Sequence, residues 1–239
     1  MTIQTTAIDY RHDDTCLEGF LAFDDSQSRP LPAIMIAHAW GGRDDFVCNK
    51  ARKLAELGYA AFALDMYGKG ILGSSPEENA RLMQPFMKDR GLLQARMQVA
   101  LDAVRKLPQV DPKRVAALGF CFGGLCVLDL ARTGANLCGV ISFHGLFIPP
   151  DNRSGQRITA KVIALHGHDD PMVTPEQLNA LARELTEAGA DWQIHIYGKT
   201  MHAFTNPRAN DPGFGTVYNE TADRRSWVSM QNFLAEVLN

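Results

Sequence analysis

The chain has 239 residues, of which 46% are hydrophobic and 21% are charged, and its formal net charge is −3. These values fit one compact domain or at most two small ones, and they exclude a disordered chain, a fibrous protein and a small disulfide scaffold. The lack of a basic excess argues against binding to nucleic acid or to an anionic membrane surface. No apolar run approaches the roughly 18 residues of a membrane-spanning helix.

The five cysteines do not form a recognisable framework. Their number is odd, their spacing is irregular and no CxxC pair occurs. Neither a disulfide scaffold nor a structural zinc site is therefore expected, and no metal or cofactor is predicted. The stretch 1–14 contains no apolar segment of the signal-peptide type, so a cytoplasmic location is expected.

Short apolar runs alternate along the chain with segments of helical spacing. The runs predicted as buried strands are 33–37, 59–64, 115–119, 139–143, 162–165 and 192–197. The helical segments lie at 93–107, 125–131 and 227–237, together with one that begins at Pro175 after Thr174 as its N-cap. This order predicts an α/β fold with a mostly parallel central sheet and helices on both faces. In such sheets, ligands bind at the carboxyl ends of the strands.

The first candidate loop follows strand 33–37 and reads His38-Ala39-Trp40-Gly41-Gly42. A glycine-containing loop at this place is suited to present a backbone amide to a ligand, and the amide of Trp40 is the best placed. An ordinary strand–helix turn would give the same pattern. Further along, the segment 69–90 breaks the regular alternation and is expected near the mouth of a pocket.

Cys121 is the candidate nucleophile. It stands in a G-x-C-x-G pattern (119–123) between a predicted strand and a predicted helix, which resembles the nucleophile elbow of α/β-hydrolases with Cys in place of Ser. The glycines keep the sharp turn free of colliding side chains, and the helix N-terminus favours thiolate over thiol. The amide of Phe122 would donate to an oxyanion. A structural cysteine in a glycine-rich turn is the alternative that so short a pattern leaves open.

Two candidate acids and one candidate base follow later strands. Asp169 and Asp170 come after strand 162–165, and either carboxylate could orient an imidazole. His202 lies in the loop after strand 192–197. Nucleophile, acid and base in this order are typical of α/β-hydrolases. Each residue alone has an ordinary structural explanation, but their order and positions together predict a catalytic triad.

These features together resemble the dienelactone hydrolase family. The segments that carry the resemblance span about residues 33 to 205 and are 38–42, 58–68, the Cys121 turn, the Asp170 turn and 201–204. The resemblance implies one α/β-hydrolase domain over residues 1–239, a triad of Cys121, Asp170 and His202, and hydrolysis of lactones or small esters. The family has its acid three residues after a Gly and three before a Val, and Gly167 and Val173 place that acid on Asp170.

The chain departs from the family at one position. Dienelactone hydrolases proper carry a Glu where Ala39 stands, so the resemblance leaves the substrate and the activation of the thiol open. Because Ala39 has no carboxylate to compete for the imidazole, we predict that Cys121 rests as a thiolate beside a protonated His202.

Further side chains are candidates for binding the substrate. Family members that act on dienelactone hold its carboxylate with arginines, which makes Arg81 and Arg208 candidates, although both also fit exposed positions. The side chains expected to line an apolar cleft are Trp40, Tyr67, Phe122 and Phe147. Plain core packing is the alternative for Phe147.

The expected ligand is a small-molecule ester or lactone, bound by a monomer or a homodimer. Within the same fold, a general carboxylesterase, a thioesterase or a peptidase is the alternative, and a non-catalytic binding protein is a third possibility. A redox or metal-binding role for Cys121 finds no support in the spacing of the cysteines.

Overall fold

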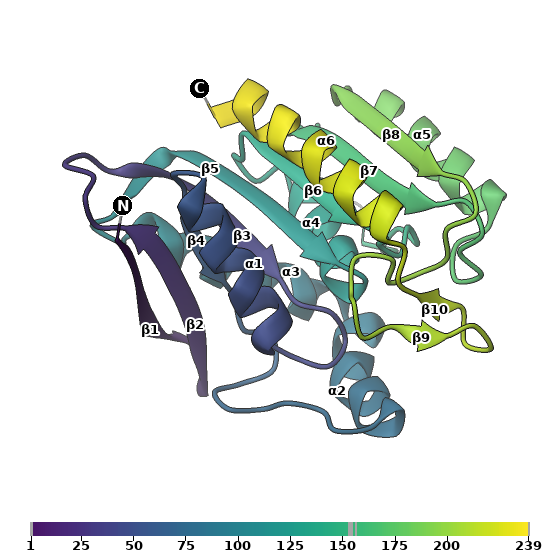
Figure 1. The fold of residues 1–239 in the computed structure, drawn as a ribbon, viewed down its shortest axis with the longest axis horizontal. Coiled ribbons are helices and arrows are strands. Elements are labelled where there is room, and N and C mark those ends of the chain that lie inside the picture. The colour runs from purple at the N-terminus through teal and green to yellow at the C-terminus, as the bar shows by residue number, and fades with distance from the viewer. Residues whose placement is uncertain (1, 153–154, 156, 239) are drawn as a thin grey trace.

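The structure, a computed structural model, describes residues 2–152, 155 and 157–238, which include every candidate site residue. Met1, which belongs to the N-terminal stretch considered above, lies outside the described residues. Within them, eight strands form one sheet in the order β1-β2-β4-β3-β5-β6-β7-β8 (Figure 1). Neighbours from β4 through β3 to β8 run parallel, whereas β2 pairs antiparallel with both β1 and β4. The strands are β1 (Ile3–His12), β2 (Thr15–Asp24), β3 (Leu31–Ala37), β4 (Ala60–Ala63), β5 (Val110–Phe120), β6 (Gly139–Phe143), β7 (Lys161–Gly167) and β8 (Trp192–Tyr197).

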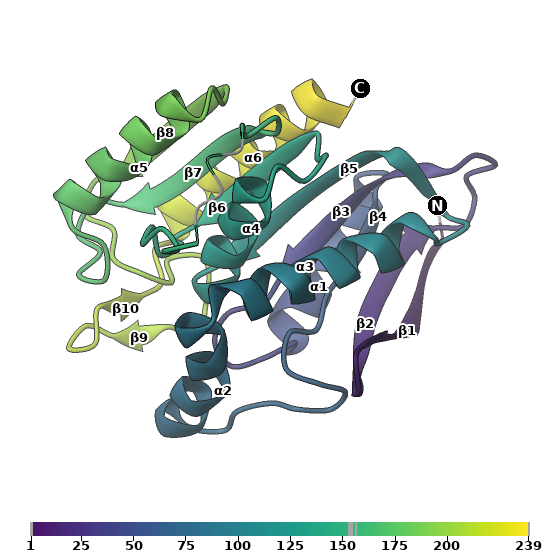
Figure 2. The same cartoon turned by 180° about the vertical axis from the view of Figure 1, so that it is seen from behind.

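Helices cover both faces of this sheet. They are α1 (Asp45–Glu56), α2 (Pro76–Lys88), α3 (Arg90–Arg105), α4 (Phe122–Arg132), α5 (Pro175–Glu187) and α6 (Glu220–Leu238). Figure 1 shows α1 and α6 on one face, and Figure 2 shows α3, α4 and α5 on the other. Side chains alternate along β3, so Ile34 belongs to the core beneath α1 and α6, and Met35 to the core beneath the other helices. In the described part of the chain, no helix is both long and apolar enough to cross a membrane.

The predicted α/β architecture is confirmed. The strands predicted at 139–143 and 192–197 coincide with β6 and β8, and the other four predicted strands differ from β3, β4, β5 and β7 only at their ends. Thr174 caps α5, because its hydroxyl accepts a hydrogen bond of 3.3 Å from the amide of Gln177. The sequence analysis missed β1 and β2. β1 is an edge strand with mostly exposed side chains, so it lacks the apolar run that marks the buried strands.

Two further elements lie beyond the carboxyl ends of the parallel strands. These are α2 and the hairpin of β9 (Asn210–Asp211) and β10 (Thr216–Val217), which Figure 1 shows at the same end of the molecule. Helix α2 begins after Ser75, whose hydroxyl accepts from the amide of Glu78, so the segment predicted to break the alternation contains a helix of its own. The candidate residues that follow β3, β5, β7 and β8 face this end of the sheet.

Candidate active site

Cys121 occupies the sharp turn between β5 and α4. Its backbone lies at φ 55° and ψ −116°, a conformation that non-glycine residues rarely adopt, and its amide donates to the carbonyl of Phe143 at 3.0 Å. A Cβ on Gly123 would lie 2.1 Å from the carbonyl oxygen of Ala37, so only glycine lets α4 approach the end of β3 this closely. The turn leaves the Cys121 side chain partly exposed at the N-terminus of α4.

Asp170 and His202 form a buried pair. The Nδ1 of His202 lies 2.7 Å from Oδ2 of Asp170, and both side chains are almost completely excluded from solvent. Asp170 is held by the amide of Met172, which donates to its Oδ1 at 2.9 Å. Asp169, the other candidate acid, is exposed. The structure therefore brings Asp170 rather than Asp169 to His202.

The surroundings of His202 favour its protonated form. Burial lowers its pKa, but the negative charge of Cys121 and the hydrogen bond to Asp170 outweigh this and raise the pKa to about 10. Within the described residues the Nε2 of His202 has no hydrogen-bond partner. The Cys121 side chain nevertheless lies close enough to the imidazole for its charge and its contact both to raise the pKa of His202.

The loop after β3 is held in place at two successive carbonyl groups. His38 is fully buried, and its Nδ1 donates to the carbonyl of Ala39 at 2.6 Å while its Nε2 accepts from the amide of Met66 at 3.2 Å. The hydroxyl of Tyr67 donates to the carbonyl of Trp40 at 2.9 Å. Among the described residues, the amide of Trp40 itself has no acceptor. An amide without a protein acceptor is what an oxyanion donor requires, and this role of Trp40 stays a prediction.

Replacing Tyr67 by phenylalanine removes the hydroxyl that holds this loop. We expect kcat/KM for ester hydrolysis to fall about tenfold, because the Trp40 amide is then less well positioned toward the developing oxyanion. Steady-state kinetics of Tyr67→Phe measure this. Tyr218→Phe is the matched control, since the Tyr218 hydroxyl contacts Asp223 at the start of α6. Equal activity of both variants and the wild type would show that the Tyr67 hydroxyl does not position the loop.

Sequence reasoning missed a second buried histidine beside His202. The ring of His144 packs edge-on against that of His202, with centroids 5.1 Å apart, and its Nε2 lies 2.8 Å from the hydroxyl of Thr205. Burial keeps the pKa of His144 well below its usual value, so it stays neutral beside the His202 cation. Only its position directly after a predicted strand could have identified His144 as a candidate site residue from the sequence.

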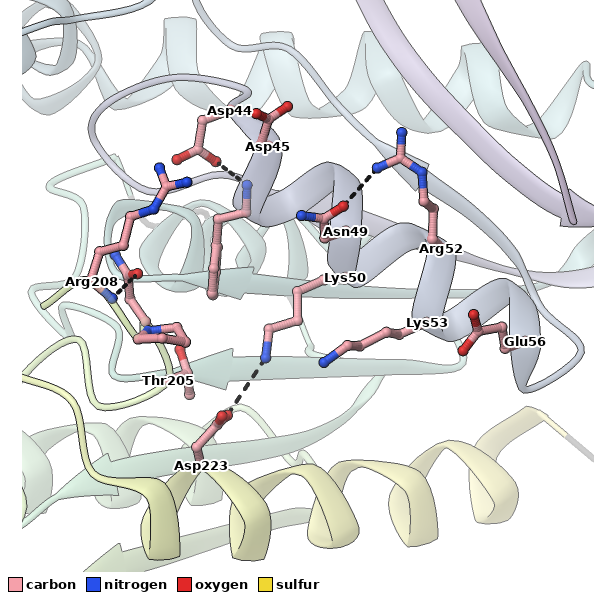
Figure 3. Close-up of a pocket in the computed structure, with 13 residues that line it drawn as sticks. Asp44, Asp45, Asn49, Lys50, Arg52, Lys53, Glu56, Thr205, Arg208 and Asp223 are labelled. Carbon is pink, nitrogen blue, oxygen red and sulfur yellow. Dashed lines mark hydrogen bonds and ion pairs between the residues drawn. The ribbon is translucent and has the colours of Figure 1, made fainter.

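The two candidate arginines lie apart from this cluster. The Arg81 side chain on α2 is 75% exposed and forms an ion pair with Glu78. Arg208 lines a cavity of about 480 Å³ between α1, α6 and the loop after His202 (Figure 3). Neither arginine forms a hydrogen bond or ion pair with the candidate triad in the described residues. Their binding to a substrate carboxylate stays a prediction.

Lys50 also lines that cavity and reaches across it with its ammonium group. This group lies 3.5 Å from Asp223 and 4.9 Å from the centre of the Trp227 ring, and Figure 3 shows it reaching from α1 toward α6. Burial lowers the pKa of Lys50. The cavity thus contains a structural contact between the two helices on this face of the sheet.

Of the other candidate residues, some lie beside Cys121 and one lies in the core. Tyr67 stacks on Phe122, with ring centres 6.1 Å apart, and both lie next to the Cys121 turn. Phe147 is buried in the core with its ring 5.5 Å from that of His166, which agrees with the alternative of core packing. Within the described residues, no group of three His, Cys, Asp or Glu side chains could hold a metal ion.

The fold and the site together define the class of the protein. A parallel sheet with helices on both faces, a Cys in the turn from β5 to α4, and a buried Asp–His pair after β7 and β8 are the features of an α/β-hydrolase. The sequence pattern of the dienelactone hydrolase family matches residues 17–238. The chain belongs to the dienelactone hydrolase family, which confirms the resemblance seen in the sequence.

Similar proteins agree with this assignment. The solved structure of a dienelactone hydrolase-like promiscuous phosphotriesterase from metagenomic libraries has a TM-score of 0.95 and 36% identity, with all of both chains covered. An uncharacterized protein of Caenorhabditis elegans, K02A2.1, is 36% identical over 61% of this chain and 94% of its own length. A putative carboxymethylenebutenolidase of Aquifex aeolicus is 26% identical over 87% of this chain and 89% of its own length.

Proposed function

We propose that this protein hydrolyses lactones or small carboxylic esters through an acyl-enzyme on Cys121. The observation that carries the proposal is the buried His202–Asp170 pair beside a cysteine with a strained backbone at the end of β5. Membership of the dienelactone hydrolase family supports the same reaction class.

In the proposed reaction, Sγ of Cys121 attacks the carbonyl carbon of the ester or lactone. The amides of Phe122 and Trp40 hold the resulting oxyanion, and each such donor is typically worth about 3 kcal/mol in the transition state. When the tetrahedral intermediate collapses, His202 gives its proton to the departing alkoxide. His202 then takes a proton from water, and the hydroxide attacks the thioester to release the acid and regenerate Cys121. Asp170 orients the imidazole and stabilises its cation throughout.

We further propose that Cys121 and His202 rest as a thiolate–imidazolium pair. The hydrogen bond between Nδ1 of His202 and the buried Asp170 carboxylate supports this, because it raises the pKa of the imidazole and so favours the imidazolium. Ala39 offers no carboxylate that could compete with the thiolate for the imidazolium. The rate constant for alkylation of Cys121 by iodoacetamide is therefore expected to change less than about threefold between pH 6 and pH 9, whereas a free thiol loses about tenfold per unit below its ordinary pKa of ~8.5.

The alkylation is measured by intact mass at several pH values, with the partly exposed Cys16 and Cys138 as internal comparisons in a peptide map. A steep fall of the Cys121 rate toward pH 6, parallel to the other two thiols, would contradict the resting ion pair.

A panel of substrates tests the reaction class itself. It contains p-nitrophenyl acetate, an aliphatic lactone, an acyl thioester, a peptide amide and a phosphotriester such as paraoxon. We expect the ester and the lactone to be hydrolysed at least about 100-fold faster than the amide, because an amide nitrogen leaves less readily from a tetrahedral intermediate on sulfur. Hydrolysis of the amide alone, or of nothing in a folded protein, would contradict the proposal.

Phosphotriester hydrolysis at the same site is a second candidate function. It is favoured by the 36% identity over full length to the promiscuous phosphotriesterase. Sγ of Cys121 would attack phosphorus and displace p-nitrophenolate from paraoxon, while the same amides hold the phosphoryl oxygen. Water deprotonated by His202 would then attack phosphorus and break the S–P bond, which frees Cys121. Turnover of paraoxon that is lost together with ester turnover in Cys121→Ala would support this second activity.

The proposal also includes the domain organisation, the oligomeric state and the cellular location of the protein. We propose that residues 1–239 act as one domain, as a monomer or a homodimer, in the cytoplasm and without nucleic-acid or membrane partners. The five free cysteines are compatible with a reducing compartment. Light scattering after size exclusion measures the oligomeric state.

A further inference from the structure

Exposed apolar side chains gather around the loop that follows β3. The indole of Trp40 stacks on the ring of Phe214, with centroids 5.7 Å apart and planes inclined by 15°. Phe214 is 48% exposed, so a large part of this aromatic surface faces solvent. On the other side of the loop, Leu72 is also exposed and packs directly over Gly42. An exposed aromatic pair next to a candidate active site offers a flat apolar face to a ligand.

Phe214 is placed by the same backbone that holds His202. Its amide donates to Oδ1 of Asp211 at 2.9 Å, and the carbonyl of the next residue, Gly215, accepts from the amide of His202 at 2.9 Å. A Cβ on Gly215 would lie 2.1 Å from Cγ of Pro171, so the hairpin packs tightly on the turn that carries Asp170. Phe214 is therefore fixed relative to the Asp–His pair.

Trp40 is placed by the other side of the site. Its carbonyl accepts from the Tyr67 hydroxyl, and its amide is the proposed oxyanion donor. The stack of Trp40 on Phe214 thus joins the oxyanion loop to the hairpin that holds His202, and Cys121 lies between these two elements in the proposed mechanism. A group attached to the reacting carbonyl would therefore lie near this aromatic surface in the proposed mechanism.

We propose that Trp40 and Phe214 form the wall that binds a flat apolar part of the substrate, and that Phe214 is a specificity-determining residue for aromatic or conjugated lactones and esters. The inference rests on the proposed function and names its substrate class. A planar group can cover the exposed ring faces with good contact, whereas a saturated ring of the same size cannot. Both side chains of this wall are uncharged aromatic rings, so the selection at the wall depends on shape and apolar contact rather than on charge.

The test compares dihydrocoumarin with δ-valerolactone, which share a six-membered lactone and differ in the fused aromatic ring. In Phe214→Ala, we expect the ratio of kcat/KM for the aromatic over the saturated lactone to fall about tenfold, mainly through KM, because an aromatic contact is lost. Phe214→Trp should keep the wild-type ratio, and Phe214→Leu should lose most of it. Val228→Ala is the matched control, since Val228 is 49% exposed on α6.

An unchanged ratio in Phe214→Ala, or an equal loss in Val228→Ala, would overturn the inference. Failure of the proposed function would show differently, as no turnover of either lactone by the wild type. If the wild type does not turn over either lactone, binding can still be measured by calorimetry. Titration of dihydrocoumarin into Cys121→Ala and into Cys121→Ala/Phe214→Ala then shows whether Phe214 contributes to binding of the aromatic lactone. We expect the second variant to bind about tenfold more weakly, and equal affinities would overturn the inference.

Discussion

Replacement of Cys121 by alanine is expected to reduce the hydrolysis of p-nitrophenyl acetate by about 10⁴-fold or more. In the proposed mechanism the variant loses the sulfur that forms a bond to the acyl group, and the proposed oxyanion donors alone supply only a small residual rate. The assay is steady-state release of p-nitrophenolate, with thermal unfolding recorded to show that the protein is folded.

Cys138→Ala is the control for this change. Cys138 is partly exposed directly before β6, and its sulfur donates a weak hydrogen bond to the carbonyl of Lys113 near the start of β5, whereas Cys121 follows the other end of that strand. We expect its activity to stay within about twofold of the wild type, as for most surface substitutions. If Cys121→Ala kept a tenth of the activity, another group would have to be the nucleophile.

Replacement of Asp170 by asparagine is expected to lower kcat by about 10³–10⁴-fold. Oδ2 of Asp170 accepts from Nδ1 of His202, and an amide at this place neither stabilises the imidazolium nor fixes the same tautomer. The pKa of His202 should fall in this variant, since the hydrogen bond and the charge of Asp170 both contribute to raising it. Its titration is followed by the NMR signals of the imidazole ring.

Asp169→Asn separates the role of Asp170 from a general effect of removing one charge from this turn. Asp169 is exposed and precedes Asp170 directly, so both variants change net charge equally. We expect Asp169→Asn to keep the wild-type rate. Equal losses of kcat in the two variants would contradict a specific role for Asp170, the carboxylate that is hydrogen-bonded to His202.

The architecture could be predicted from the sequence wherever burial produces a continuous apolar pattern. β6 is buried throughout and was predicted with its observed bounds, and the cap at Thr174 follows from simple local chemistry. β8 also has its predicted bounds, but the prediction that it is buried was wrong, because its side chains are half-buried or exposed at the edge of the sheet. β1 and α2 could not be predicted in the same way, because β1 is an exposed edge strand and α2 carries few buried side chains. Their places depend on tertiary packing that no local pattern encodes.

Some residues of the candidate site could likewise be predicted from local sequence, whereas others are defined only by tertiary contacts. Cys121 and His202 could be proposed because each follows a strand and the chain order is distinctive, whereas residues alone did not separate Asp169 from Asp170. His38 and His144 escaped notice because their contacts, to the Met66 amide and to the His202 ring, come from distant parts of the chain. Such supporting residues are defined by geometry rather than by sequence spacing.

The placement of the two arginines limits what family resemblance can say about the substrate. Arg81 is exposed on α2 and Arg208 lines the Lys50 cavity, while the aromatic surface of Trp40 and Phe214 lies at the oxyanion loop. Binding of a substrate carboxylate by the arginines and binding of a planar apolar group at the Trp40–Phe214 wall are separate predictions, which the lactone comparison and arginine variants test individually.

The most direct test of the account is the intact mass of the protein during turnover of excess p-nitrophenyl acetate, quenched in acid and followed by a peptide map. If Cys121 forms the proposed acyl-enzyme, we expect an acetyl adduct on Cys121 that accumulates with the p-nitrophenolate burst and disappears when the ester is exhausted. Turnover by a protein that stays unmodified, or an adduct confined to another residue, would contradict a cysteine acyl-enzyme in this site.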